Sequence, residues 1–125
     1  YVEEDIRGVV EIAHAHSIAV KVILETCFLT PEMIVASCRA AERAGADFVK
    51  TSTGYGTAGA RIEDCVLMRS SVSDKVQVKA SGGIRTLDQT LAYRKAGCMI
   101  GSRATAAILE EAEIREKGGT LRELD

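Results

Sequence analysis

The sequence lacks the features that mark membrane, nucleic-acid-binding and secreted proteins. It contains no apolar run long enough to cross a bilayer, and its first residues, YVEEDIRG, are too acidic and polar for a secretory signal peptide. The net charge of -2 gives no general attraction for nucleic acid. Because the 125 residues are 46% hydrophobic and 27% charged, we expect one soluble, cytoplasmic globular domain over residues 1–125.

Cysteine and histidine are too few and too scattered to predict a metal site. The two histidines, His14 and His16, lie at the end of a predicted helix, where positive charge suits the helix dipole and a surface role is expected. The cysteines are separated by 11, 27 and 33 residues, which matches no zinc-ligand spacing. We therefore expect free thiols in a reducing cytosol at Cys27, Cys38, Cys65 and Cys98.

Short apolar segments alternate with helical patterns along the chain. Strands are predicted over 19–26, 47–53, 76–82 and 98–102, because each segment is short, apolar and rich in β-branched residues. Helices are predicted over about 3–16, 30–46, 60–72, 86–97 and 105–117, with threonine N-caps at Thr30 and Thr86. This order, one helix and then four βα units, predicts parallel strands joined by crossover helices.

Three lysines decide between the two architectures that fit this order, an open doubly wound sheet and a (β/α)8 TIM barrel. Lys21, Lys50 and Lys79 are spaced 29 residues apart, and all three lie in predicted strands. Helices cover both faces of a doubly wound sheet, so mid-strand lysines would be buried there at high cost. In a barrel, polar residues on the inner face line the active-site mouth, and the lysines favour that fold.

Four βα units are only half of a barrel, which takes about 200–250 residues. The sequence also begins with Tyr1 rather than an initiator methionine, which indicates a processed, trimmed or partial chain. Four strands leave both sheet edges unpaired. We therefore expect that the chain needs the missing half-barrel, or a second copy of itself in a homo-oligomer.

Lys50 is the predicted catalytic nucleophile and Lys79 its catalytic partner. An amine attacks a carbonyl only after losing its proton, and desolvation or a nearby cation lowers the pKa of lysine. Strands lie roughly 5 Å apart, so adjacent ammonium groups would repel until one loses its proton. This pattern favours Schiff-base chemistry, whereas surface lysines paired with carboxylates are the alternative. Glu25 is such a carboxylate, with pairing to a lysine of the inner face preferred over a supporting acid role.

Glycine-rich segments follow three of the predicted strands. They read TGYGTAG over 53–59, ASGGIRT over 80–86 and IGSRAT over 100–105. Glycine allows close backbone approach, and amides at a helix start bind anions. Two such loops after the last two strands match the usual phosphate site of (β/α)8 enzymes. A phosphorylated substrate is therefore predicted, with Arg85 either adding charge or pairing locally.

The segments KVILET, AGADFVKTSTG and VKASGGIRT, followed by AG…IG, closely resemble deoxyribose-phosphate aldolase, a class I aldolase on a TIM barrel. The resemblance extends from about residue 6 to 109. It implies reversible cleavage of 2-deoxy-D-ribose 5-phosphate to acetaldehyde and D-glyceraldehyde 3-phosphate, with a Schiff base on Lys50 tuned by Lys79 and no cofactor. The substrate and phosphate would be bound by Lys21, Thr53, Gly54, Gly82, Gly83, Ile84, Arg85, Gly101 and Ser102.

The chain departs from this family in two respects. The family places a catalytic aspartate of its proton relay on an earlier strand, which has no counterpart here. The family also has small or hydroxyl residues at the two positions after Gly101, where this chain has Ser102 and Arg103. Arg103 either strengthens or crowds phosphate binding. Two other readings are a non-enzymatic half-barrel scaffold and an isomerase barrel, but isomerases rely on carboxylate bases rather than paired lysines.

Overall fold

Four parallel strands form one sheet at the centre of the computed structural model, which describes residues 1–121. Their order in space is the same as in sequence, β1-β2-β3-β4. A doubly wound sheet reverses its strand order, whereas successive barrel strands are neighbours. The order therefore agrees with the predicted four βα units of a (β/α)8 barrel. The strands are β1 (Lys21–Ile23), β2 (Phe48–Lys50), β3 (Gln77–Ser81) and β4 (Cys98–Gly101).

The predicted strand ranges were too long, most of all for the first strand. After β1 the chain turns at Glu25, whose φ of 56° is left-handed, and continues as the short 3-10 helix η1 (Thr26–Phe28). The ladder nevertheless continues through single hydrogen bonds, from Leu24 N to Lys50 O and from Thr26 N to Thr51 O. The apolar pattern therefore marks the whole extended segment, of which only the middle has regular strand geometry.

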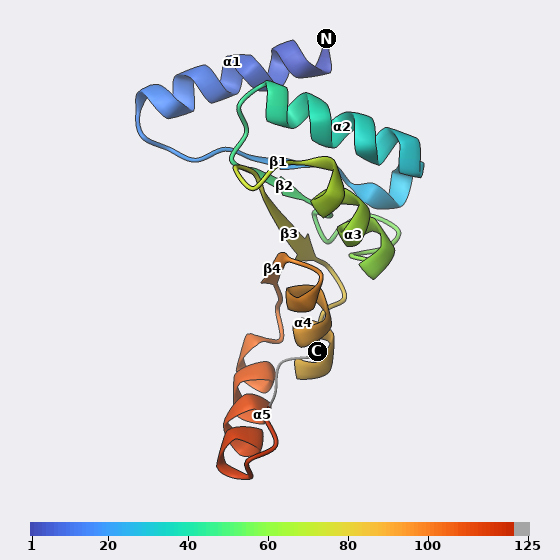
Figure 1. The fold of residues 1–125 in the computed structure, drawn as a ribbon, viewed down its shortest axis with the longest axis vertical. Helices are drawn as coiled ribbons and strands as arrows, with labels where there is room; N and C mark the ends of the chain where they lie inside the picture. The colour runs from blue at the N-terminus through green and yellow to red at the C-terminus, as the bar shows by residue number, and fades with distance from the viewer. Residues whose placement is uncertain (122–125) are drawn as a thin grey trace.

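Within residues 1–121, five helices accompany the strands, and the predicted N-caps are present. The Thr30 side chain accepts a hydrogen bond from Met33 N, and Thr86 forms a reciprocal capping box with Gln89. Figure 1 shows the helices following one another from α1 and α2 at the top to α5 at the bottom. They are α1 (Val2–Ala15), α2 (Pro31–Arg43), α3 (Ile62–Ser71), α4 (Leu87–Lys95) and α5 (Thr105–Lys117).

The helices cover one face of the sheet and form the core with it. Val49, Val78 and Ala80 point into this layer and are at most 1% exposed. They pack with Ile34 of α2 and Met68 of α3, both also buried. The expected apolar face of α2 is present, because Cys38 and Ala41 are buried beside Ile34.

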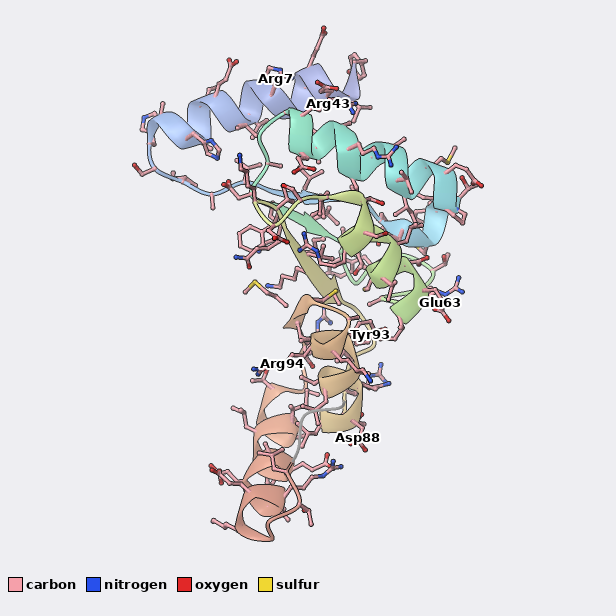
Figure 2. The ribbon with its side chains drawn as sticks, viewed as in Figure 1. Arg7, Arg43, Glu63, Asp88, Tyr93 and Arg94 are labelled. Carbon is pink, nitrogen blue, oxygen red and sulfur yellow. The ribbon has the colours of Figure 1, made fainter. Side chains whose placement is uncertain are left out.

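The helices are also joined to one another by polar contacts. Arg43 of α2 binds the carboxylate of Glu3 at 2.8 Å and thereby links α2 to α1. Arg7 binds the same carboxylate from within α1, also at 2.8 Å; Figure 2 shows both arginines where these helices meet. At the other end, Arg115 of α5 pairs with Asp88 of α4 at 2.7 Å.

The opposite face of the sheet carries the lysines and is open in the described part of the chain. Alternation along the strands directs Lys21, Lys50 and Lys79 to this face. Ile23 and Met99 flank the lysine pair and are 43% and 48% exposed. This face corresponds to the inner surface of a barrel. No helix of the described residues is both long and apolar enough to cross a membrane.

Candidate active site

The strand register brings the two candidate catalytic lysines together. Lys50 of β2 lies directly opposite Lys79 of β3, and both side chains are half-buried. Ile23 lies opposite Lys50 on the other side, and Met99 lies opposite Lys79. The pair therefore occupies the centre of one row of four side chains across the open face. The 29-residue spacing in the sequence reflects this pairing.

Lys21 does not lie in the same row across the sheet as Lys50 and Lys79, although the equal spacing suggests that it should. The register pairs it with Phe48, two residues below Lys50, and its ammonium nitrogen lies 5.4 Å from the centre of the Phe48 ring. The connection between β1 and β2, which includes η1 and α2, sets this offset, and residue counting does not reveal it. Lys21 is nevertheless close enough for its charge to act on Lys79.

This cluster of cations lowers the pKa of Lys79. The largest cause is repulsion by Lys21, followed by partial desolvation and by repulsion from Lys50. The sequence predicted that Lys50, as the nucleophile, is the lysine that loses its proton. It did not identify Lys21 as a charge that acts on Lys79. In the structure, the neighbouring cations disfavour the protonated form of Lys79.

A cavity of about 520 Å³ opens above the lysine pair, at the carboxyl ends of β2, β3 and β4. Ten of the eleven residues predicted for the site line it, and Lys21 is the exception. Four lining side chains are basic, and none of the described lining residues is a carboxylate. The cavity is lined by Lys50, Thr53, Gly54, Lys79, Ser81, Gly82, Gly83, Ile84, Arg85, Gly101, Ser102, Arg103 and Ala104.

Two glycines allow the loops around the cavity to touch. A Cβ added to Gly59 would lie 2.3 Å from the carbonyl oxygen of Gly82, and one added to Gly82 would lie 2.8 Å from Gly59 Cα. The contact is held by Ala60 N, which donates at 3.0 Å to both Ser81 O and Gly82 O. Tyr93 adds a tether, because its hydroxyl donates to Ala60 O at 2.9 Å. Close backbone approach was the predicted reason for glycine in these loops.

Some polar groups around the cavity already have partners within the chain. The Gln89 side chain accepts from the N–H groups of Arg85 and Thr86, at 2.8 and 3.2 Å. The Ser102 hydroxyl donates to Ile84 O at 2.5 Å and accepts from Ala104 N at 3.0 Å. These two amides and this hydroxyl hold the loops in position. An anion would therefore depend on the glycine amides and the basic side chains.

The first turn of α5 adds positive potential to the same cavity. Its N-cap, Ala104, lines the cavity and supplies no side-chain cap. The amides of the first helical turn have no intrahelical acceptor, and the helix dipole places partial positive charge there. Ala104 and Ser81 were not predicted as lining residues, because small side chains give no chemical signal in a sequence.

Glu25 supports the loop after β2 and is not paired with a lysine among the described residues. Its carboxylate accepts hydrogen bonds from the backbone N–H and the hydroxyl of Thr53. The preferred prediction, an ion pair with a lysine of the inner face, was therefore wrong. The left-handed turn at Glu25 aims its side chain at the neighbouring loop, a direction that strand alternation does not predict.

The histidines and cysteines lie away from the cavity lining. His14 pairs with Asp47 at 2.8 Å, and the ring of His16 bonds to Ile12 O, which fits the expected surface role. All four cysteines are free thiols, and only Cys27 is not buried. Among the described residues, no group of three or more histidine, cysteine or acidic side chains is arranged to hold a metal ion.

The chain is similar to curated aldolases over nearly its whole length. It is 51% identical over 117 residues to a deoxyribose-phosphate aldolase of Thermococcus gammatolerans and 53% identical over 113 residues to one of Streptococcus sanguinis. These matches cover 93% and 90% of this chain but 52% and 50% of the relatives. The chain thus spans about half the length of the curated relatives it matches.

Solved structures and a family model lead to the same family. A structure described as "QR15, an Aldolase" superposes with a TM-score of 0.84 at 36% identity, covering 92% of this chain and 52% of the other. A tetrameric deoxyribose phosphate aldolase from Aeropyrum pernix superposes with a TM-score of 0.81 at 33% identity, covering 89% and 48%. A family model described as DeoC/LacD family aldolase matches residues 2–107. The chain belongs to the DeoC/LacD family of aldolases.

Proposed function

We propose that this chain carries the Schiff-base and phosphate-binding half of a deoxyribose-phosphate aldolase. The reaction is reversible cleavage of 2-deoxy-D-ribose 5-phosphate to acetaldehyde and D-glyceraldehyde 3-phosphate, a step of deoxyribonucleotide catabolism. The observation that carries the proposal is the lysine pair, Lys50 opposite Lys79, beneath a cavity whose described lining is basic and free of carboxylates. A reducing, cytoplasmic location fits the four free thiols.

The phosphate group is assigned to the upper part of the cavity. Gly82 and Gly83 both have positive φ, 90° and 77°, so their loop can turn its amides toward an anion. Gly54 and Gly101 also line the cavity, and Arg85 adds charge. Ile84 and Ser102 contribute by joining two loops, through the bond from the Ser102 hydroxyl to Ile84 O. Thr53 is fixed by Glu25, and Lys21 acts from below through its charge.

The lysines share the proton transfers. A neutral Lys79 takes a proton from the Lys50 ammonium, and the freed amine attacks the substrate aldehyde carbon. Protonated Lys79 then returns this proton to the hydroxyl of the adduct, which leaves as water and gives a protonated Schiff base and a neutral Lys79. Removal of the proton from the C3 hydroxyl breaks the C2–C3 bond, and the Schiff base accepts the electron pair as an enamine. Lys79 is the group of the described lining that can take up this proton and later return it to the enamine carbon.

Trapping with acetaldehyde and borohydride tests this proposal. The reduced Schiff base adds a two-carbon group to one lysine, which intact mass and peptide mapping locate. We expect the adduct on Lys50 in the folded chain and its loss in Lys50→Met. Lys75→Met is the matched control, because Lys75 is exposed and lies outside the cavity lining. A folded sample that forms no adduct on Lys50 would contradict the proposal for this chain.

The second candidate is a half-barrel scaffold without catalysis, and the open sheet face favours it. Ile23 and Met99 leave apolar surface beside the lysines, so water reaches the pair in the chain alone. Either the remaining half-barrel or a second copy of the chain must cover this face for efficient catalysis. The Aeropyrum pernix relative is described as tetrameric, which supports oligomerisation here. Native mass spectrometry tests this, and a stable monomer would exclude pairing of two copies.

A further inference from the structure

Arg103 extends from the loop after β4 across the cavity toward the loop after β2. Its guanidinium carbon lies 5.7 Å from the centre of the Tyr55 ring and over that ring. A Cβ added to Gly54 would lie 4.0 Å from Arg103 Nη2, so the side chain reaches the neighbouring loop. Arg103 also lines the cavity. One cation thus bridges two loops that flank the proposed phosphate position.

The contact with Tyr55 leaves the hydrogen-bond donors of Arg103 available. A cation–π contact needs only the charge near the ring face, and the five N–H donors of the Arg103 guanidinium form no hydrogen bond with the described residues. Among the described residues, Arg103 has no carboxylate within ion-pair distance. The ring of Tyr55 therefore reduces the freedom of the side chain without occupying the edge that would bind a phosphate in a bidentate way.

We propose that Arg103 is a specificity-determining residue that binds the phosphate group of a phosphate-monoester substrate, and that Tyr55 is the positioning residue that holds its guanidinium over the cavity. This inference rests on the proposed function, since it concerns the phosphate end of the same site. Where the family has a small or hydroxyl residue, Arg103 would then strengthen phosphate binding rather than crowd it. Crowding is disfavoured because Arg103 leans onto Tyr55, which is 86% exposed, at the rim of the cavity.

Titration of the full chain with inorganic phosphate at neutral pH, followed by amide NMR, measures this contribution directly. We expect Arg103→Gln to weaken binding roughly ten- to hundredfold, the usual loss for a charge-assisted pair. Arg103→Lys keeps the charge without the planar fork, so it should lie between Arg103→Gln and the unsubstituted chain. Arg39→Gln is the matched control, because it removes the same charge from an exposed position on α2.

Two variants test the positioning role of Tyr55. We expect Tyr55→Ala to weaken phosphate binding about two- to fivefold, the size of an exposed cation–π contact. Tyr55→Phe retains the ring and should restore binding to that of the unsubstituted chain. Equal effects of Tyr55→Ala and Tyr55→Phe would overturn the positioning role, because the hydroxyl would then be responsible.

The failure of this inference can be told apart from the failure of the proposed function. Acetaldehyde carries no phosphate, so trapping on Lys50 in the unsubstituted chain reports the Schiff base alone. A Lys50 adduct together with equal phosphate affinity in Arg103→Gln and the unsubstituted chain would overturn the role of Arg103 and leave the aldolase proposal intact. The role of Arg103 would also be overturned if Arg39→Gln lost as much phosphate affinity as Arg103→Gln, or if the unsubstituted chain bound no measurable phosphate.

Discussion

Substituting Gly59 by alanine should destabilise the chain far more than the loss of one hydrogen atom suggests. The new Cβ would lie 2.3 Å from Gly82 O and 2.4 Å from its carbonyl carbon, whereas non-bonded atoms sit about 3.5 Å apart. Both neighbours are backbone, so a loop must move by about 1 Å. That movement strains the bonds from Ala60 N to Ser81 O and Gly82 O, both 3.0 Å.

The expected loss follows from two contributions. Overpacking costs about 1–3 kcal/mol, and an amide left without its acceptor adds about 1 kcal/mol or more. Together they predict a decrease of about 2–4 kcal/mol in the free energy of unfolding for Gly59→Ala. For a small domain this is a large share of the total stability.

Two other glycines serve as controls in the same urea titrations, followed by circular dichroism. Gly83 has a φ of 77° and no atom within 4 Å of an added Cβ, so Gly83→Ala should lose about 1 kcal/mol from backbone strain alone. Gly8 lies exposed inside α1 with the same open space, so Gly8→Ala should gain about 0.8 kcal/mol. If Gly59→Ala unfolds no more easily than Gly83→Ala, the close contact of the two loops is refuted.

Three further predictions concern titration and reactivity. Lys21→Met should raise the pKa of Lys79, because Lys21 is its largest source of repulsion; side-chain NMR titration measures this, and an unchanged pKa would contradict the assigned cause. Asp47→Asn should reduce stability at neutral pH, where the ionised carboxylate holds His14 and Val20 N. Those bonds lower the pKa of Asp47 below its usual 3.8, so the difference from the unsubstituted chain should shrink in urea titrations as the pH falls below 3.8. Iodoacetamide should alkylate Cys27 first in the native chain, because the other thiols are buried, and peptide mass mapping would detect an exception.

The order of elements and the helix caps could be predicted because their signals are local. Thr30 and Thr86 are followed three residues later by the amides that they bind, so a short stretch of sequence contains the whole interaction. Strand length could not be predicted in the same way. The apolar run around β1 continues past Ile23, and the left-handed turn at Glu25 that ends the regular geometry has no glycine to announce it.

The sequence predicts those parts of the site that follow from the repeated βα unit. It does not predict contacts between long side chains of different loops. Equal spacing identified Lys50 and Lys79 as neighbours, and the register agrees. The same spacing failed for Lys21, because the chain between β1 and β2 shifts the register by two residues. The contact between Arg103 and Tyr55 joins two loops that are almost fifty residues apart in sequence, and no local pattern records it.

Anion binding and lysine chemistry place different demands on this chain. The described cavity lining comes from the ends of β2, β3 and β4 and from the loops that follow them, so the proposed phosphate site needs no other strand. The lysine pair instead lies on a face where Ile23 and Met99 are about half exposed, and water there screens the repulsion that lowers the pKa of Lys79. Covering this face should therefore lower that pKa further while changing phosphate affinity little. Phosphate binding is thus the property that the chain should show by itself, whereas a fast Schiff-base reaction should require the covered face.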